Sequence, residues 1–191
     1  MRRIVCLGDS LTSGHGIGST AAFPALLHQR VRRAGFPYEV VNAGVSRDTS
    51  AHTRARLDRA LEGDVRVLVL ALGANDGLRG VPVAQLTANV SHIIETAQTR
   101  GISVLLCGME ALPIHGWAYT AAFHQAYPAL VARYHVALVP FILLNVFGDA
   151  RLMQADGAHP NAAGARAIAD VIWPHLEQLL ASPSVLASPS K

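Results

Sequence analysis

Short apolar runs recur five times along the chain, and segments with helical spacing separate them. The runs are rich in Val, Ile and Leu and cover residues 3–7, 38–42, 66–72, 103–107 and 137–140. They are continuously apolar rather than alternating, which is typical of strands buried on both faces of a parallel sheet. The pattern therefore predicts five such strands.

The intervening segments place apolar residues at helical intervals. The clearest case is 83–99, where they fall at i, i+4, i+7, i+8 and i+11 from Leu86. Helices are predicted at 22–34, 49–61, 83–99, 120–134 and 162–180. The last is expected to break near Trp173-Pro174, because proline has no N–H for the helical hydrogen bond and its ring crowds the preceding turn.

Alternation of strands and helices indicates a three-layer α/β/α domain with helices on both sheet faces. In such folds ligands bind beyond the carboxyl ends of the strands, so functional residues are expected in the loops that follow strands. The chain has 191 residues, which suits one domain. We place that domain at 1–180 and expect the Ala-Ser-Pro-Ser-rich tail, 181–191, to be disordered.

Composition excludes several classes of protein. Hydrophobic residues make up 51% of the chain and charged residues 15%, with a mean hydropathy of +0.29, which excludes a disordered chain. No apolar stretch approaches the roughly 18 residues of a membrane span, so stable membrane insertion is not expected. The formal net charge is +3, but the basic residues form neither a concentrated stripe nor a nucleic-acid-binding motif. Nucleic acid is not an expected partner.

Cysteine usage and the N-terminus carry little functional information. Cys6 and Cys107 lie within strand-like runs, with neither the number of a disulfide framework nor the spacing of a zinc site. The apolar run after Met1 is too short for a signal peptide, so the chain as written is expected in the cytoplasm. A periplasmic or secreted mature form without its leader is the alternative. The sequence does not indicate an oligomeric state.

The first strand ends in Gly8-Asp9-Ser10-Leu11, which would present Ser10 at the functional edge of the sheet. A serine hydroxyl becomes a nucleophile only with a general base and donors for the oxyanion. Capping of a helix is an equally common use of such a serine. The glycines that follow do not fit a dinucleotide-binding loop, because Gly-x-Gly-x-x-Gly from Gly14 would need glycine at Ser19.

Two further strands end in residues that could donate to an oxyanion. Gly44 follows the second run and allows close approach to the backbone N–H, although it could be an ordinary turn glycine. Asn75 lies in Gly73-Ala74-Asn75-Asp76-Gly77 after the third run and offers an uncharged amide donor, although asparagine also favours turns.

Near the C-terminus, Asp156-Gly157-Ala158-His159-Pro160 places a carboxylate three residues before an imidazole. This offset lets Asp156 reach His159 Nδ1 and leaves Nε2 free to take a proton from a serine. The alternative is a loop in which Asp156 caps local amides and His159 lies on the surface. His15 is close to Ser10 in sequence and is a rival candidate for the base.

Taken together and in this order, the four motifs resemble those of the SGNH (GDSL-type) hydrolases, over residues 8–160. The similarity is to the bacterial thioesterase I/protease I/lysophospholipase L1 branch, which includes arylesterases. It implies a flavodoxin-like five-stranded parallel sheet in the order 2-1-3-4-5. It also implies Ser10 as nucleophile, His159 as base, Asp156 as its orienting partner, and an oxyanion hole made of the Ser10 and Gly44 N–H groups and the Asn75 amide.

An acyl chain needs an apolar site, and the loop at 109–119, after the fourth run, is the candidate. We expect Leu112, Pro113, Ile114 and Trp117 to bind substrate, although these side chains could equally cap the core. In the resembled branch this segment lines the acyl site.

The sequence thus predicts a serine esterase that hydrolyses carboxylic esters and thioesters through an acyl-enzyme, with a small-molecule substrate as its partner. The substrates expected are aryl esters, short-to-medium acyl chains and lysophospholipids. No cofactor and no metal are expected. One alternative is a non-catalytic flavodoxin-like module that binds a small ligand. A carbohydrate acetylesterase is another, which would prefer a wide polar cleft.

Overall fold

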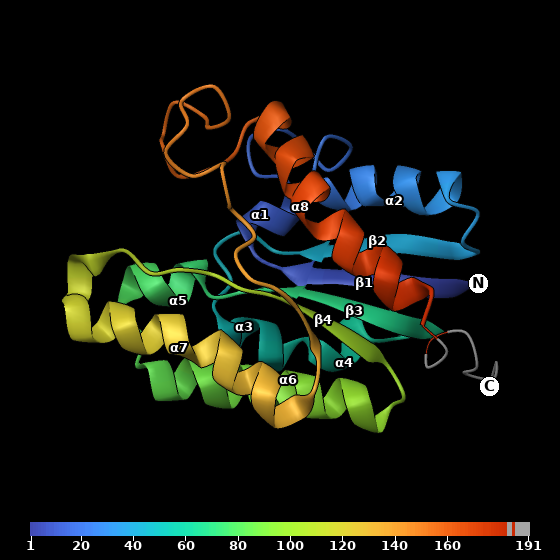
Figure 1. Ribbon diagram of the computed structural model, residues 1–191, viewed down its shortest axis with the longest axis horizontal. Helices are drawn as coiled ribbons and strands as arrows, with labels where there is room; N and C mark the ends of the chain where they lie inside the picture. The colour runs from blue at the N-terminus through green and yellow to red at the C-terminus, as the bar shows by residue number, and fades with distance from the viewer. Residues whose placement is uncertain (183–184, 186–191) are drawn as a thin grey trace.

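The computed structural model describes residues 1–182 and Val185 and shows a parallel sheet between two layers of helices (Figure 1). The sheet order is β2-β1-β3-β4-β5, which confirms the predicted fold class and order. The strands are β1 (Arg2–Gly8), β2 (Tyr38–Gly44), β3 (Val65–Ala71), β4 (Ser103–Cys107) and β5 (Ala137–Val139).

The sheet lies inside the molecule because its strands are apolar on both faces. All seven residues of β3 are buried, and so are the last five of β1. The predicted domain boundary stays a prediction. So does the disordered tail, because 183–184 and 186–191 lie outside the described residues.

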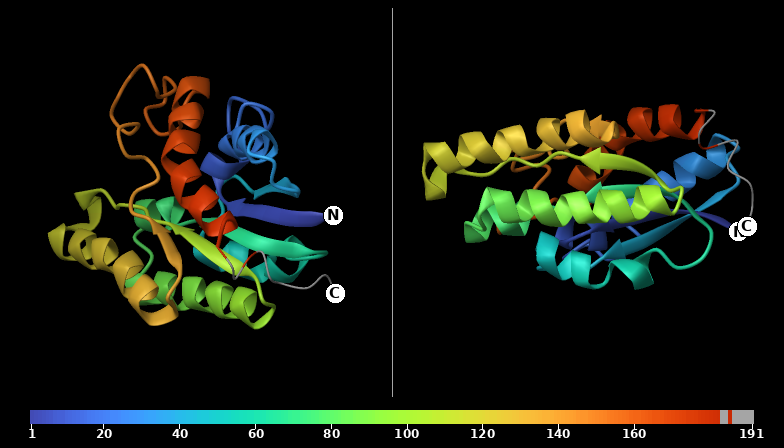
Figure 2. Two further views of the ribbon diagram at one scale, coloured as in Figure 1. Left: turned by 45° about the vertical axis from the view of Figure 1, so that its right-hand side comes forward. Right: turned by 90° about the horizontal axis from the view of Figure 1, so that it is seen from below.

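The long helices divide between the two faces of the sheet (Figures 1 and 2). Helices α2 (Phe23–Arg33) and α8 (Ala162–Leu180) pack together on one face. The other face is covered by α3 (Ser50–Ala55), α4 (Leu57–Ala60), α6 (Val83–Thr99) and α7 (Trp117–Tyr134). The short helices α1 (Ser10–Ser13), α5 (Ala74–Arg79) and the 3-10 helix η1 (Pro113–His115) lie in the loops after β1, β3 and β4.

The predicted break at Trp173-Pro174 is wrong, because α8 runs through Pro174 without interruption. A proline inside a helix costs about 3 kcal/mol. The buried face of α8 continues on both sides of Pro174, with Ile172 before it and Leu176 after it, both 0% exposed. Burial of that continuous face against the sheet offsets the missing hydrogen bond.

The helix predicted at 49–61 is divided into α3 and α4 at Arg56, which leaves helical geometry with φ −110° and ψ 11°. The guanidinium of Arg56 donates to the backbone oxygens of Gly8 and Ala43 at the ends of β1 and β2. These contacts between distant segments explain why the local helical pattern does not continue through Arg56.

The strand register brings the carboxyl ends of all five strands to one edge. Residues at these ends are paired across the sheet in the order Gly44, Gly8, Ala71, Cys107 and Val139. The loops that follow therefore lie side by side, which sets the geometry of the candidate site. The same register separates Cys6 on β1 from Cys107 on β4 by the whole of β3, and both cysteines are buried and free.

Candidate active site

Ser10 is held at the start of α1 by the residue before it. Asp9 is the N-cap of this short helix, and its Oδ1 accepts a hydrogen bond from Leu11 N–H (3.0 Å). The Asp9 side chain is fully buried, and burial raises its pKa to about 7. Its second carboxyl oxygen has no hydrogen-bond partner among the described residues. Ser10 itself is half-buried and faces the cavity at the strand ends.

A chain of hydrogen bonds links Ser10 to His159 and Asp156. His159 Nε2 lies 3.1 Å from Ser10 Oγ, and His159 Nδ1 lies 2.7 Å from Asp156 Oδ2. The first distance is within the 2.6–3.2 Å that a general base requires. Asp156 Oδ1 also accepts from the backbone N–H groups of Ala158 (2.9 Å) and His159 (3.0 Å), so the carboxylate caps its loop and reaches the imidazole at once.

Those contacts determine the charge state of Asp156. The backbone N–H of His159, its imidazole and the N–H of Ala158 together hold the pKa of the Asp156 carboxyl well below its usual range. The carboxylate stays ionised throughout the pH range in which an esterase works, and so it can stabilise a positively charged His159.

Gln154, which the sequence analysis missed, closes the loop that carries His159. Its backbone N–H donates to His159 O (2.7 Å), and its side-chain amide donates to Pro160 O (2.9 Å) and His15 O (2.7 Å). The hydrogen bond from the Gln154 amide to His15 O joins two segments that are 139 residues apart. No local sequence signal marks such a residue, because its three acceptors are all backbone carbonyls.

The backbone N–H of His15 donates to Ser10 O (3.1 Å), but among the described contacts its imidazole lies against His159 rather than on the Ser10 hydroxyl. The centroids of the two imidazole rings are 4.5 Å apart and their planes are tilted by 43°. Because the Ser10 hydroxyl is paired with His159, the geometry favours His159 over His15 as the base and makes His15 a packing partner of that base.

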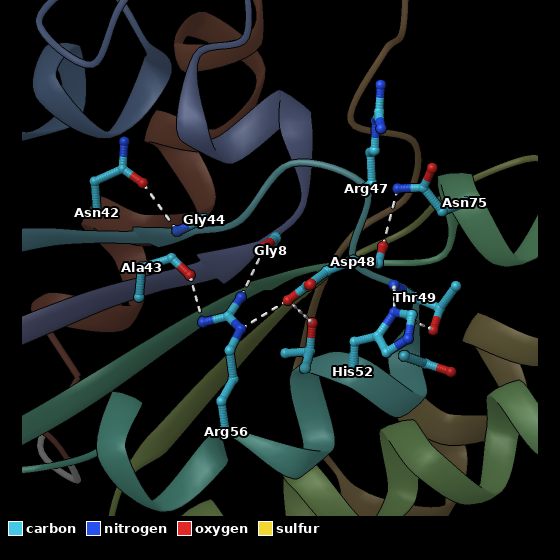
Figure 3. A network of polar contacts seen from close by, with 12 residues as sticks. Gly8, Asn42, Ala43, Gly44, Arg47, Asp48, Thr49, His52, Arg56 and Asn75 are labelled. Atoms are coloured by element: carbon cyan, nitrogen blue, oxygen red, sulfur yellow. Dashed lines mark hydrogen bonds and ion pairs between the residues drawn. The ribbon is translucent and has the colours of Figure 1, made fainter.

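Asn75 lies in the first turn of α5, directly after β3. Its Nδ2 donates one hydrogen bond to Asp48 O (2.9 Å), which fixes the amide and leaves its second N–H for another acceptor (Figure 3). The backbone can turn from β3 into α5 because residue 73 is glycine. Its φ is +118°, and a Cβ at Gly73 would lie 2.0 Å from Tyr127 Oη. Asn75 and Ser10 line the same cavity.

The structure does not bring Gly44 into that cavity. Its N–H donates to Asn42 Oδ1 (3.0 Å), as Figure 3 shows. A Cβ at this position would lie 2.3 Å from Ser13 N, so glycine is needed for close packing of β2 against α1. The assignment of Gly44 to the oxyanion hole is therefore corrected.

Arg47, three residues further on, lines the cavity instead. Asp48 N–H donates to Val45 O (3.2 Å), which closes a turn with Arg47 at its third position and φ +71°. That position usually requires glycine, because a side chain there is strained. The N–H of Arg47 has no hydrogen-bond partner among the described residues. Arginine does not favour positive φ, so the residue type itself does not mark this turn, although the resembled family often has glycine at Arg47.

Arg56 and Asp48 clamp the turn to the sheet (Figure 3). Arg56 Nε donates to Asp48 Oδ2 (2.7 Å), while its two terminal nitrogens donate to Ala43 O (2.9 Å) and Gly8 O (3.1 Å). A single guanidinium thus ties together the ends of β1 and β2 and the turn that carries Arg47. Because Asp48 O also accepts from Asn75, these contacts fix the two candidate oxyanion donors relative to each other.

The cavity has a volume of about 380 Å³ and crosses the carboxyl edge of the sheet. At the β4 and β5 end its lining is mainly apolar, formed by Met109, Ala111, Leu112, Phe141, Leu143 and Phe147, with Glu110 as the charged residue among the described lining there. Phe141, Leu143 and Phe147 follow β5 and were missed, because an apolar stretch after a short strand resembles core in sequence.

Only Leu112 among the four predicted substrate-binding residues lines this cavity. The other three do not: Pro113 and Ile114 lie in η1, Trp117 begins α7, and all are exposed, Trp117 at 77%. His115 Nε2 lies 3.1 Å from Leu78 O, which directs this segment along α5 rather than across Ser10. The alternative expectation, that these side chains cap the core, is also wrong.

In the described part of the chain, no three or more His, Cys, Asp or Glu side chains form a group suited to a metal ion, and no helix has the length and apolarity to cross a membrane. The absence of cofactor and metal stays a prediction.

The three-layer fold, with a serine, a histidine and an aspartate joined at the strand ends, is typical of a serine hydrolase. Residues 6–167 match the GDSL-like Lipase/Acylhydrolase family, and the chain belongs to that family. It is a carboxylic ester hydrolase.

Relatives named as esterases cover most of the chain. Esterase TesA from Pseudomonas aeruginosa is 40% identical, over 93% of this chain and 89% of the relative. Thioesterase 1/protease 1/lysophospholipase L1 from Escherichia coli is 34% identical, over 93% and 84%. Arylesterase from Vibrio mimicus is 34% identical, over 89% and 86%.

Solved structures of esterases share the fold of this chain. The crystal structure of TesA superposes with a TM-score of 0.88 and covers 94% of this chain and all of that one, at 40% identity. AlinE4, an SGNH-hydrolase family esterase, has a TM-score of 0.77 at 35% identity, over 95% and 97%.

Proposed function

We propose that Ser10 is the nucleophile of this esterase, that His159 is its general base and then its acid, and that Asp156 orients and stabilises the imidazole. The observation that carries this proposal is the hydrogen-bonded chain from Ser10 Oγ through His159 to Asp156, with distances of 3.1 and 2.7 Å. The Nδ1 bond to Asp156 leaves Nε2 able to accept the proton of the serine.

The reaction proceeds in two halves. Ser10 Oγ attacks the carbonyl carbon as its proton passes to His159 Nε2, and the tetrahedral intermediate collapses when His159 returns the proton to the leaving alcohol or thiol. Water then attacks the acyl-enzyme with His159 again as base, which releases the acid and restores Ser10.

The oxyanion hole is proposed to consist of Ser10 N–H, Arg47 N–H and the free N–H of the Asn75 amide. Arg47 replaces Gly44 in this role, because the N–H of Gly44 is already bonded to Asn42. The three donors lie on loops after β1, β2 and β3 at one edge of the sheet, and the clamp formed by Arg56 and Asp48 holds them before substrate arrives. Donors fixed in advance stabilise developing charge most effectively.

The acyl group is proposed to occupy the apolar end of the cavity, formed by the loops after β4 and β5. Its size suits short-to-medium acyl chains and aryl groups rather than a small acetyl group alone. We expect aryl esters, acyl thioesters and lysophospholipids to be substrates, in keeping with the names of the relatives. A carbohydrate acetylesterase would need a polar cleft and is disfavoured. Family membership likewise disfavours the non-catalytic binding module.

Hydrolysis of p-nitrophenyl esters from acetyl to palmitoyl tests this proposal. Wild type should be most active on medium chains, and Ser10→Ala should fall to background. The matched control is Ser19→Ala, which removes an exposed serine from the loop after α1. Activity that survives without Ser10 would overturn the nucleophile assignment, and no activity across the series would overturn the substrate class.

The compartment stays a prediction. The cytoplasm is expected, with a periplasmic or secreted mature form as the alternative, and fractionation of cells that produce the natural protein distinguishes the two.

A further inference from the structure

The cavity around Ser10 has two chemically different ends. Because the strand order is β2-β1-β3-β4-β5, the loops line up with Arg47 after β2, Ser10 after β1, Asn75 after β3, and the apolar side chains after β4 and β5. Ser10 therefore lies between an apolar end and an end occupied by a guanidinium. If the acyl chain takes the apolar end, the alcohol or thiol portion of the substrate lies toward Arg47.

The Arg47 side chain is exposed and has no hydrogen-bond or ion-pair partner among the residues that the structure describes. Arg56, nine positions further on, is by contrast paired with Asp48. In Figure 3 the Arg47 side chain points away from this polar network. An unpaired guanidinium beside a reactive serine is available to a ligand.

Among the described lining residues, no carboxylate lies at this end of the cavity. Arg79 lies beside Arg47 and donates through Nη2 to the backbone oxygen of Arg47 (3.0 Å), so a second guanidinium approaches the same turn. Arg79 has no ion pair among the described residues. Glu110 is the only carboxylate among the lining residues that the structure describes. It belongs to the loop after β4, where His124 Nδ1 lies 2.7 Å from its Oε1.

The backbone at Arg47 is an independent indication. A residue with a side chain at φ +71° in a turn costs about 1–2 kcal/mol relative to glycine. Strain of this kind clusters at functional sites, and of the three described non-glycine residues with positive φ, Arg47, His135 and Asn145, only Arg47 lines the cavity. Glycine would supply the same backbone N–H without strain. The presence of arginine at this position therefore points to a role for its side chain.

We infer that Arg47 is a specificity-determining residue which favours esters and thioesters whose leaving group carries a phosphate. This inference rests on the proposed function. Guanidinium groups bind phosphate oxygens through paired, charge-assisted hydrogen bonds. Arg79 adds a second positive charge at the same turn.

The test compares two substrates that share an acyl chain, 1-octanoylglycerol and 1-octanoylglycerol 3-phosphate, both below their micelle concentrations. The readout is the ratio of kcat/KM for the phosphorylated ester to kcat/KM for the neutral one. Any effect of a substitution on the oxyanion donor acts on both substrates and cancels in this ratio.

Arg47→Gln should lower the ratio about tenfold, which corresponds to about 1.4 kcal/mol, and Arg47→Lys should restore part of it. The matched control is Arg166→Gln, which removes an exposed charge from α8 away from the cavity and should leave the ratio within about twofold. An unchanged ratio in Arg47→Gln, or an equal fall in Arg166→Gln, would overturn the inference.

A binding experiment separates this inference from the proposed function. Calorimetric titration of Ser10→Ala with 1-octanoylglycerol 3-phosphate needs no turnover. Weaker binding after the further change Arg47→Gln supports the phosphate contact even if wild type hydrolyses neither ester, a result that would count against the proposed function alone. Equal binding by the two proteins contradicts the contact.

Discussion

The imidazole ring of His15 lies against that of His159, with centroids 4.5 Å apart, while His159 alone is hydrogen-bonded to Ser10 Oγ. His15 therefore packs against the ring of the proposed general base, and its backbone oxygen is tied to the same loop through Gln154. We therefore expect the two histidines to have different chemical tasks, although both line the cavity with Ser10.

Substitution separates these tasks. His159→Ala should lower kcat by about 10²- to 10⁴-fold, the usual contribution of a general base. His15→Phe keeps a flat ring against His159 and should retain most of the activity, measured as hydrolysis of p-nitrophenyl butyrate. A loss in His15→Phe as large as that in His159→Ala would reassign the base.

Asn75→Ala should lower kcat by about 10²- to 10³-fold, or roughly 2.7–4 kcal/mol of transition-state stabilisation, with little change in KM. The reason is that the oxyanion forms only in the transition state, so ground-state binding does not depend on this donor. Steady-state kinetics with the same ester measures both constants. A rise in KM with unchanged kcat would show that Asn75 binds substrate instead.

How much of the fold and of the candidate site could be predicted from the sequence depended on the kind of sequence pattern available. Continuous apolar runs determine buried parallel strands, so the sheet was predictable. The spacing of Asp156 and His159 placed a carboxylate within one turn of an imidazole, and the 2.7 Å contact agrees with that geometry. Both signals are carried by side-chain type and by short sequence separation.

The features that were missed depend on backbone geometry or distant contacts. Glycine suggested an available N–H at Gly44, whereas the N–H without a partner among the described residues belongs to Arg47, which has positive φ in a turn clamped by Arg56. The apolar wall after β5 resembled core, and Trp117 resembled a substrate contact. In each case the fold decides which way a side chain or an N–H faces, and residue type does not.

Arg47→Gly should stabilise the protein. Glycine adopts φ +71° without strain, so the free energy of unfolding should rise by about 1 kcal/mol. Arg47→Ala removes the same side chain without relieving the strain and is the matched control. Urea denaturation compares the three proteins, and an equal gain in both variants would trace the effect to the loss of charge rather than to the turn.

The two cysteines should be inert in the folded protein. Burial raises the pKa of the Cys107 thiol to about 12 and that of Cys6 higher still, so neither forms a thiolate at neutral pH. Titration with a thiol reagent should therefore detect no reactive thiol in native protein and two after denaturation without reductant. Detection of none in the denatured protein would reveal a disulfide, which is incompatible with β3 lying between the two strands.

The buried carboxyl of Asp9 should make stability depend on pH. Burial raises its pKa from 3.8 to about 7 in the folded protein, so between these values the native state holds a proton that the unfolded state has lost. Stability from this group is therefore present at low pH and decreases as pH rises toward 7, by about 4 kcal/mol at most.

The experiment compares wild type with Asp9→Asn, which cannot ionise and can still cap α1. The free energy of unfolding of wild type minus that of Asp9→Asn should fall between pH 4 and pH 7 and level off above it. The difference isolates Asp9, because the other titrating groups are common to both proteins. A difference that is constant over this range would mean that Asp9 is ionised in the folded protein, and its second oxygen, which has no partner among the described residues, would then need a buried water or cation.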